Sequence, residues 1–266
     1  MTFAPVKSGA LILALAACAP ALAQNVFDDF SSGNDNTWTR IDAPDLFLGV
    51  PSTYSVENGG YRLRGPVYPN VGLNLPTASV RVDGAAANSQ ISVDAVDWEE
   101  RQTQTIAMAA RLQQVGSMAF QFYSLVFFPR STVGAGLSNF RLDRWNADGS
   151  VSNITSNLLF PQVDPDHDFR LVFTVEGSSL RGDLYNLTLD PLNPYQTISA
   201  IDSSPLAITG IGLPGIFTTP NPGNIGLPTF GPADVTFDNF RVVPAPGAAA
   251  LLGVSGLLAT RRRRAR

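Results

Sequence analysis

Hydrophobic and polar residues alternate over short segments along most of this chain. In 61–64 and 140–144 the apolar side chains fall on one face and the charged ones on the other, as in a half-solvated antiparallel sheet. No apolar stripe with a period of 3.6 residues is sustained long enough to predict a helix in the body of the chain. The clearest strands are predicted at 54–56, 60–64, 90–94, 106–111, 119–128, 139–144, 169–175, 179–185 and 235–242.

The segments between these strands define the organisation of the body. Gly, Asn and Asp at 57–60, 146–149 and 176–177 predict hairpin turns. The Pro- and Gly-rich stretch 210–232 alternates too little for a strand, so we expect it to cross the domain as a long loop. Since neither a repeat nor a linker interrupts residues 24–243, the pattern predicts one all-β domain of two sheets packed face to face.

The N-terminal residues have the layout of a secretory signal peptide. Lys7 supplies the positive region, 10–17 the apolar region, and Ala21-Leu22-Ala23 a small-x-small cleavage site. We therefore expect residues 1–23 to be removed and the mature chain to begin near Gln24. An alternative is a lipobox at 15–18, which would make Cys18 a lipidated N-terminus, but ordinary cleavage is favoured because the Ala-Leu-Ala site is well formed.

The C-terminal residues 244–266 form a second signal. Pro244, Ala245 and Pro246 precede an apolar stretch, 247–259, that is shorter than the roughly 20 residues a bilayer-spanning helix needs. The basic end consists of Arg261, Arg262, Arg263, Arg264 and Arg266. The positive-inside rule holds arginines on the cytoplasmic side, so we expect transient insertion into the inner membrane followed by cleavage. A marginal tail anchor is the alternative.

This tail resembles the PEP-CTERM sorting signal of bacterial exosortase substrates, with Ala245 in place of the middle Glu. The resemblance implies processing near the triplet by an exosortase-type enzyme, loss of the basic end, and attachment or release at the cell envelope, the surface or the extracellular matrix. The two terminal signals together predict an exported protein.

The cysteine content and the charge balance of the chain both change when the two terminal segments are left out. Cys18 is the only cysteine, so the mature chain would lack disulfides, thiol nucleophiles and cysteine zinc sites. Lys7 and the five terminal arginines account for 6 of 18 basic residues, which leaves 12 against 22 acidic ones, a balance of −10. This balance argues against nucleic acid as a partner and favours cations or neutral polymers.

The body resembles concanavalin A-like and laminin-G-like jelly rolls, a sandwich superfamily of secreted glycan-associated proteins. The resemblance rests on 27–33 with 38–40, on 169–173 with 177–181, and on 235–242. It implies that the first and last strands are neighbours. It also implies a structural calcium where they meet, with Asp28 or Asp29 and Asp238 as ligands; the alternative is that these carboxylates cap turns or face water.

Candidate catalytic residues are few. Asp97 and Glu99 are two apart, so a strand would place them on one face with Trp98 opposite, the geometry of a retaining glycosidase pair. The polar residues that follow favour a solvated strand end leading into a turn. His167 is the only histidine and lies in an acidic loop, where a solvent-facing role is the simpler interpretation.

Carbohydrate binding needs aromatic platforms, for which Trp145 and Trp38 are the candidates, although core packing is the commoner role of tryptophan. Two hypotheses remain open. The first is a non-catalytic surface or matrix protein that associates with exopolysaccharide, and the second is a secreted glycan-cleaving hydrolase that uses Asp97 and Glu99.

Overall fold

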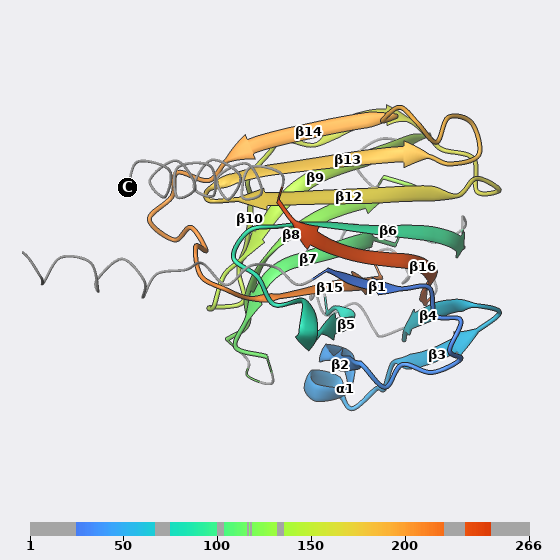
Figure 1. The fold of residues 1–266 in the computed structure, drawn as a ribbon, viewed down its shortest axis with the longest axis horizontal. Coiled ribbons are helices and arrows are strands. Elements are labelled where there is room, and N and C mark those ends of the chain that lie inside the picture. Colours follow the sequence, from blue (N-terminus) through green and yellow to red (C-terminus); the bar gives the residue numbers. More distant parts are fainter. Residues whose placement is uncertain are drawn as a thin grey trace, which may run out of the picture.

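Two antiparallel sheets packed face to face make up the described chain, which confirms the predicted all-β class (Figure 1). The computed structural model describes residues 25–66, 75–99, 104–115, 117, 119–131, 136–220 and 232–245. Within these residues each sheet contains eight strands. The nine strands expected from the alternation all occur, with ends shifted by a few residues.

Sheet A runs from β14 at the top of Figure 1 to β3 at the bottom. Its strands in spatial order are β14 (Gln196–Ile201), β13 (Ser179–Asn186), β12 (Phe169–Glu176), β6 (Ser89–Trp98), β16 (Ala233–Pro244), β4 (Gly60–Gly65) and β3 (Thr53–Glu57), with β1 (Val26–Asp28) paired to β16.

Sheet B forms the second layer. Its strands in spatial order are β10 (Val151–Asn153), β9 (Leu137–Trp145), β8 (Gln121–Phe128), β7 (Ile106–Gln113), β15 (Leu213–Thr218), β5 (Thr77–Arg81) and β2 (Trp38–Asp42), with β11 (Leu158–Pro161) paired to β9. The helix α1 (Ala43–Leu48) follows β2 directly. Asp42 caps it by accepting a hydrogen bond from the Asp45 N–H, and Gly49 ends it with a left-handed backbone.

The first and last described strands are neighbours, as the resemblance implied. Val26 lies opposite Val242 and Asp28 opposite Phe240, so β1 and β16 run antiparallel along the same part of sheet A. Residues 25 and 245 therefore lie at the same end of the sandwich.

The core between the sheets is built from alternate residues of nearly every long strand. On β12, Phe169, Leu171, Phe173 and Val175 are fully buried, while the residues between them are partly exposed. This alternation is what a period of two requires when one face of a sheet is buried. Burial of each such side chain stabilises the fold by roughly 1.5–3 kcal/mol.

The expectation of a loop throughout 210–232 is wrong for its first half. Leu213–Thr218 is β15, a central strand of sheet B that pairs with β5 on one side and β7 on the other. Pro214 cannot donate to the ladder, and it lies at a shift in register between Leu213 and Gly215. An added Cβ at Gly215 would lie 2.7 Å from the Ser79 carbonyl oxygen, so a close approach of strands required glycine there.

The terminal signals lie largely outside the described residues. Residues 1–24, with Cys18, and 246–266, with Pro246 and the arginine cluster, are not described, whereas Pro244 ends β16 and Ala245 follows it fully buried. Among the described residues, no helix has the length and apolarity needed to cross a membrane.

Candidate functional site

A second apolar cluster lies outside the core, on the outer face of sheet B. On β8, the side chains of Tyr123, Leu125 and Phe127 enter the core, whereas those of Phe122 and Phe128 belong to this second cluster. We call the cluster the floor. Its buried members are Ala78, Val80, Ala107, Ala109, Leu112, Phe122, Val126, Phe128 and Phe217, and Ile41, Phe120, Trp145 and Leu213 pack against them.

Aromatic rings dominate one half of the floor. The rings of Phe122 and Trp145 are stacked, with centroids 5.2 Å apart and an interplanar angle of 12°, because β8 and β9 place these residues directly opposite one another. Phe217 meets both rings edge-on, and Phe120 lies 6.0 Å from Phe122. These contacts hold Trp145 in one orientation at the rim of the floor, where it is partly exposed.

Polar side chains cross the floor beside these rings. Ser124 on β8 lies opposite Asp143 on β9, and Phe128 lies opposite Asn139. Ser124, Asn139 and Asp143 are at most 2% exposed. Nevertheless, Ser124 Oγ, Asn139 Oδ1 and Asp143 Oδ1 have no hydrogen-bond partner among the described residues, and neither does Trp145 Nε1.

Unpartnered polar atoms at such depth are costly. Each buried donor or acceptor without a partner destabilises a fold by about 1–3 kcal/mol, so natural proteins rarely leave several together. Among the described residues, only one other buried side-chain nitrogen or oxygen has no hydrogen-bond partner, namely Trp98 Nε1 in the core. Four of the five such atoms among the described residues are therefore grouped on the outer face of sheet B.

Asp143 is the carboxylate of this site. Its Oδ2 accepts a hydrogen bond of 2.8 Å from Arg141 Nε, and the Arg141 guanidinium lies 4.9 Å above the Phe128 ring. Burial raises the pKa of the Asp143 carboxyl, and the charge and hydrogen bond of Arg141 only partly oppose this. Asp143 is the one carboxylate among the outward-facing described residues of β5, β7, β8, β9 and β15.

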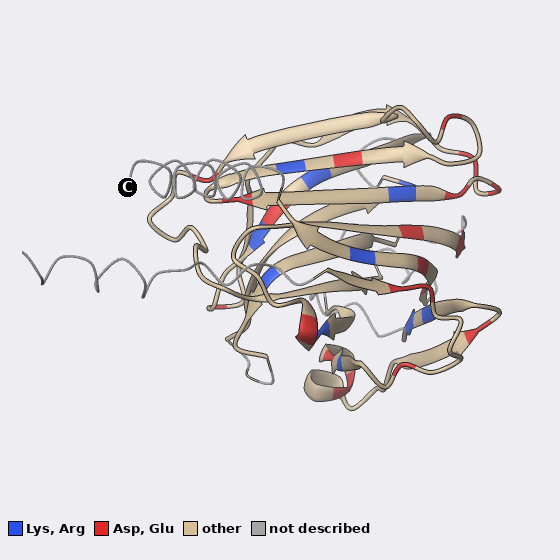
Figure 2. Cartoon of the chain, in the orientation of Figure 1, with Lys and Arg blue, Asp and Glu red and all other residues tan. Residues whose placement is uncertain are grey.

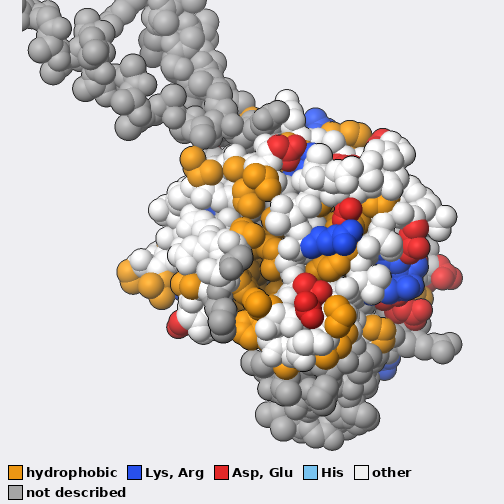
Figure 3. Space-filling model, turned by 90° about the horizontal axis from the view of Figure 1, so that it is seen from below, with side chains coloured by type: hydrophobic (Ala, Val, Ile, Leu, Met, Phe, Trp, Pro, Cys, Tyr) orange, Lys and Arg blue, Asp and Glu red, His pale blue; other side chains and the backbone are white. Residues whose placement is uncertain are grey.

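The floor continues into a hollow near α1. An apolar pocket lined by Ala109, Phe120, Phe122 and Phe217 adjoins a second pocket that reaches Leu46 of α1. Ile41 and Phe120 line both pockets, which are therefore neighbours. Figure 3, which views the molecule from below, on the side of α1 and β3, shows hydrophobic side chains gathered in such a hollow between polar ones.

The two tryptophans expected to bind a ligand lie in different settings. Trp145 is part of the floor. Trp38 is 7% exposed and packs against Phe30, Tyr61 and Phe240 in the core. This burial argues against Trp38 as a stacking platform.

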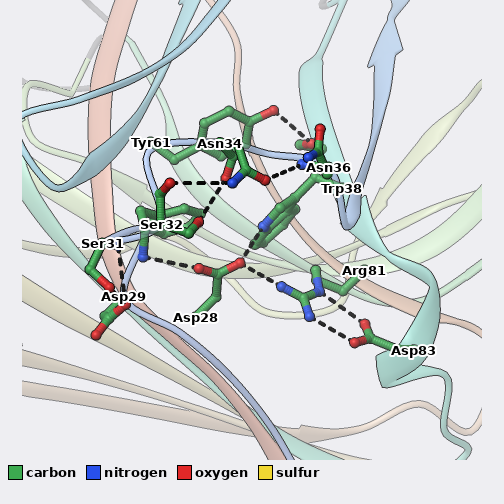
Figure 4. Close-up of polar contacts among 12 residues, drawn as sticks. Asp28, Asp29, Ser31, Ser32, Asn34, Asn36, Trp38, Tyr61, Arg81 and Asp83 are labelled. Atoms are coloured by element: carbon green, nitrogen blue, oxygen red, sulfur yellow. Dashed lines mark hydrogen bonds and ion pairs between the residues drawn. The ribbon is translucent and has the colours of Figure 1, made fainter.

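Asp28, one of the expected calcium ligands, is bonded to Arg81 (Figure 4). Asp28 Oδ1 accepts a hydrogen bond from the Phe30 N–H, and Oδ2 accepts from Trp38 Nε1 at 2.9 Å and from Arg81 at 2.5 Å. Arg81 also makes two hydrogen bonds to Asp83. Because hydrogen-bond donors and a cation already occupy both oxygens, the residues at Asp28 do not fit a calcium ion.

Asp29 and Asp238 lie nearby without completing a site. Asp29 accepts hydrogen bonds from the backbone and hydroxyl of Ser31, while Asp238 accepts from the backbone and side chain of Asn239. Burial raises the pKa of Asp238, and the charges of Asp94, Asp29 and Asp28 add to that effect. Among the described residues, no group of three or more His, Cys, Asp or Glu side chains is arranged to hold a metal ion.

Asp97 and Glu99 lie away from the floor. Asp97 is exposed on the outer face of sheet A, 3.4 Å from the Arg62 guanidinium, and Trp98 points into the core as expected. Glu99 follows the end of β6 and is exposed, and its carbonyl accepts a hydrogen bond from Gln104. Catalysis by this pair stays a prediction.

One feature of the sequence does indicate an apolar surface outside the core. Residues Phe122–Phe128 are apolar on both faces of β8, the pattern of a strand covered on both sides. On β9, by contrast, Asp143 and Arg141 look like an ordinary solvated face. Only the register with β8 brings Asp143 beside Ser124.

Comparisons with known proteins show the fold. No protein-family model matches the chain, and no curated protein sequence matches it. Solved structures do match. A β-1,3-1,4-glucanase (lichenase) derived from a mouse hindgut metagenome is 10% identical with a TM-score of 0.54, over 83% of this chain and 99% of its own.

Two further structures are similar to the same extent. The laminarinase from Flavobacterium sp. UMI-01 has 12% identity and a TM-score of 0.54, over 84% of this chain and 99% of its own. The CBM2 module of the evolved Dit of Lactobacillus casei BL23 phage J-1 has 12% identity and a TM-score of 0.51, over 83% and 96%. The protein is therefore an all-β jelly-roll sandwich of the kind found in β-glucanases, and at these identities the likeness concerns the fold alone.

Proposed function

We propose that this protein is an exported glycan-binding protein and that its ligand lies on the floor of sheet B. The observation that carries the proposal is the group of four buried polar atoms without partners, which lie beside stacked aromatic rings on one face. An apolar surface with a few convergent polar groups is typical of small-molecule and saccharide sites.

The chemistry of the floor matches a saccharide. The apolar face of a sugar ring can pack on Trp145, whose indole is fixed by Phe122 and Phe217. Asp143 Oδ1 and Asn139 Oδ1 are acceptors, so they require hydroxyl or amide donors from the ligand. Ser124 Oγ can donate as well as accept. Hydroxyl groups along a sugar supply such partners.

The second candidate is glycan cleavage, which the comparisons support at least as well, since the structures that resemble this chain include a lichenase and a laminarinase. The raised pKa of Asp143 suits a general acid. Hydrolysis by two carboxylates needs a partner about 5–9.5 Å away.

Export and sorting belong to the same proposal. A signal peptide at 1–23 and a PEP-CTERM-like signal at 244–266 would deliver the sandwich to the envelope, surface or extracellular matrix through an exosortase-type enzyme. Exopolysaccharide is then the glycan that the sandwich meets.

Calorimetric titration with laminarihexaose and cellohexaose, together with an assay for released reducing sugar, tests both candidates. We expect at least one hexaose to bind wild-type protein, and Trp145→Ala to weaken that binding by about tenfold or more. Ile201→Ala is the matched control, since Ile201 is 71% exposed on the edge strand β14 of the other sheet, and it should bind like wild type.

The outcomes separate the two functions. Binding without sugar release supports the binding protein, whereas release that Asp143→Asn abolishes supports the hydrolase. If Trp145→Ala binds the hexaoses as tightly as wild type does, the floor is not the site.

A further inference from the structure

A polar groove crosses the outer face of sheet A, on the opposite side of the sandwich from the floor. Strands β16, β6, β12 and β13 form it, and its lining includes Ser92, Arg170, Asp183, Tyr185 and Arg241. The register places Arg241 opposite Ser92, Ser92 opposite Val172, and Val172 opposite Asp183. One cross-strand row therefore runs along the bottom of the groove from a cation to an anion.

Most charges on this face are paired, and their alternation is visible in Figure 2. Arg170 donates two hydrogen bonds to Asp94, of 2.6 and 2.8 Å. Arg181 Nε donates a hydrogen bond of 2.9 Å to Asp183 Oδ2. Arg241 differs, because it is exposed and makes no ion pair or side-chain hydrogen bond with any described residue. It leaves one uncompensated positive charge in the groove.

An exposed aromatic side chain flanks that charge. Phe27 on β1 lies directly opposite Arg241 in the β1–β16 pairing, and it is 62% exposed. Tyr185, from β13, lines the groove as well. Aromatic rings at a wet surface commonly serve recognition, because they offer a flat apolar face at small entropic cost.

We propose that this groove binds a carboxylate-bearing oligosaccharide, with its carboxylate on the Arg241 guanidinium and a sugar ring against Phe27. A guanidinium donates two parallel hydrogen bonds to the oxygens of a carboxylate, which distinguishes an acidic sugar from a neutral one. Ser92 in this row and Gln90, which also lines the groove, supply neutral hydrogen-bonding groups. The acidic balance of the body does not prevent this, because charges more than about 8 Å away are largely screened at physiological salt.

Titration of the purified protein with tetragalacturonate and with its methyl ester tests the proposal. We expect wild-type protein to bind the acid about tenfold more tightly than the ester, and Arg241→Gln to remove this preference. Arg64→Gln is the matched control, since Arg64 lies on the same face but is held by Asp234 at 2.7 Å. Near-ultraviolet circular dichroism would verify that the exposed substitutions leave the fold intact.

Three results would overturn the proposal. They are equal affinity of wild-type protein for acid and ester, unchanged binding of the acid by Arg241→Gln, and absence of acid binding at millimolar concentration. A Trp145→Ala variant distinguishes this site from the floor, because it should bind the acid as wild type does. Loss of acid binding in that variant alone would place the ligand on sheet B instead.

Discussion

At the scale of single residues, the carboxylates of Asp28 and Asp143 lie in contrasting environments. Asp28 has donors on both oxygens and joins β1, β2 and β5 through the Phe30 N–H, the Trp38 indole and the Arg81 guanidinium. Asp143 is buried with one oxygen unpartnered. The first carboxylate is satisfied by the protein itself and acts in stability, whereas the second has capacity left for a ligand.

Replacing Asp28 with Asn should destabilise the fold by about 3 kcal/mol, because the substitution leaves the buried Arg81 without one of its anionic partners and turns an N–H group toward two donors. Urea denaturation of the wild type and the variant measures the difference. Asp29→Asn is the control, since Asp29 is exposed and should change stability by less than about 0.5 kcal/mol.

Thermal unfolding of wild-type protein with and without a chelator tests the calcium expectation. If Asp28 acts through Arg81 rather than through a metal ion, a chelator leaves the melting temperature of wild-type protein unchanged. A drop in melting temperature on chelation, restored by added calcium, would show that Asp29, Asp238 and neighbouring carbonyls hold the ion without Asp28.

Asp143 predicts a pH dependence of stability. Burial raises its pKa in the folded state, so between the unfolded and the folded pKa the folded protein binds more protons, and the free energy of unfolding falls as pH rises through this window. Asp143→Asn removes that titration. We therefore expect the melting temperature of the variant minus that of wild type to increase from pH 3 to pH 7. A constant or decreasing difference would contradict the raised pKa.

At the scale of elements, β15 shows how a central strand can lack the usual signs of one. Pro214 and Gly215 are residues that argue against a central strand. In β15, however, the proline lies at the register shift and the glycine lets β5 approach. Between two neighbours, β15 carries Ile216 into the core and Phe217 onto the floor. The strand thus links the packing of the sandwich to the candidate site.

Gly215→Ala should destabilise the protein by about 1–3 kcal/mol, because the new Cβ would lie 2.7 Å from both the Ser79 carbonyl oxygen and Val80 Cγ1 on the paired strand β5. Thermal unfolding would measure the loss. Ser199→Ala on the edge strand β14 is the control and should unfold at the wild-type temperature.

The strands with clear alternation could be predicted from the sequence because each buries one face, as β12 does with Phe169 and Phe173. The pairing of β1 with β16 was also expected, but only from a resemblance. The apolar part of the floor had a signal in β8, but its polar residues could not be predicted, because a pattern of residues does not contain the register that sets Ser124 beside Asp143. Nor does the sequence pattern show that Trp38 and Asp28 both contact Arg81, which comes from a distant strand.

At the scale of the whole molecule, the two outer faces of the sandwich have different chemistry. The outer face of sheet B is apolar with a few buried polar atoms, whereas that of sheet A carries paired arginines and aspartates. The core separates them, and the two proposed sites share no residue. Each face can therefore be changed without altering the other.

The double variant Trp145→Ala/Arg241→Gln should show this independence. For each ligand, its affinity should match that of the single variant on the corresponding face, because residues without shared partners act additively. Titration with laminarihexaose or cellohexaose and with tetragalacturonate would measure both. A deviation of more than about 0.5 kcal/mol from additivity would mean that the faces communicate through the core.

The antiparallel pairing of β1 with β16 also determines how the protein responds to mechanical load. Since Val26 faces Val242, a force that separates the two ends of the domain opens β1 from β16 one hydrogen-bonded pair after another, like a zipper. A force along the length of β16 instead loads its bonds to β6 and β4 together in shear. The same strand therefore yields easily when β1 is pulled from it at the end and resists a pull along its own axis.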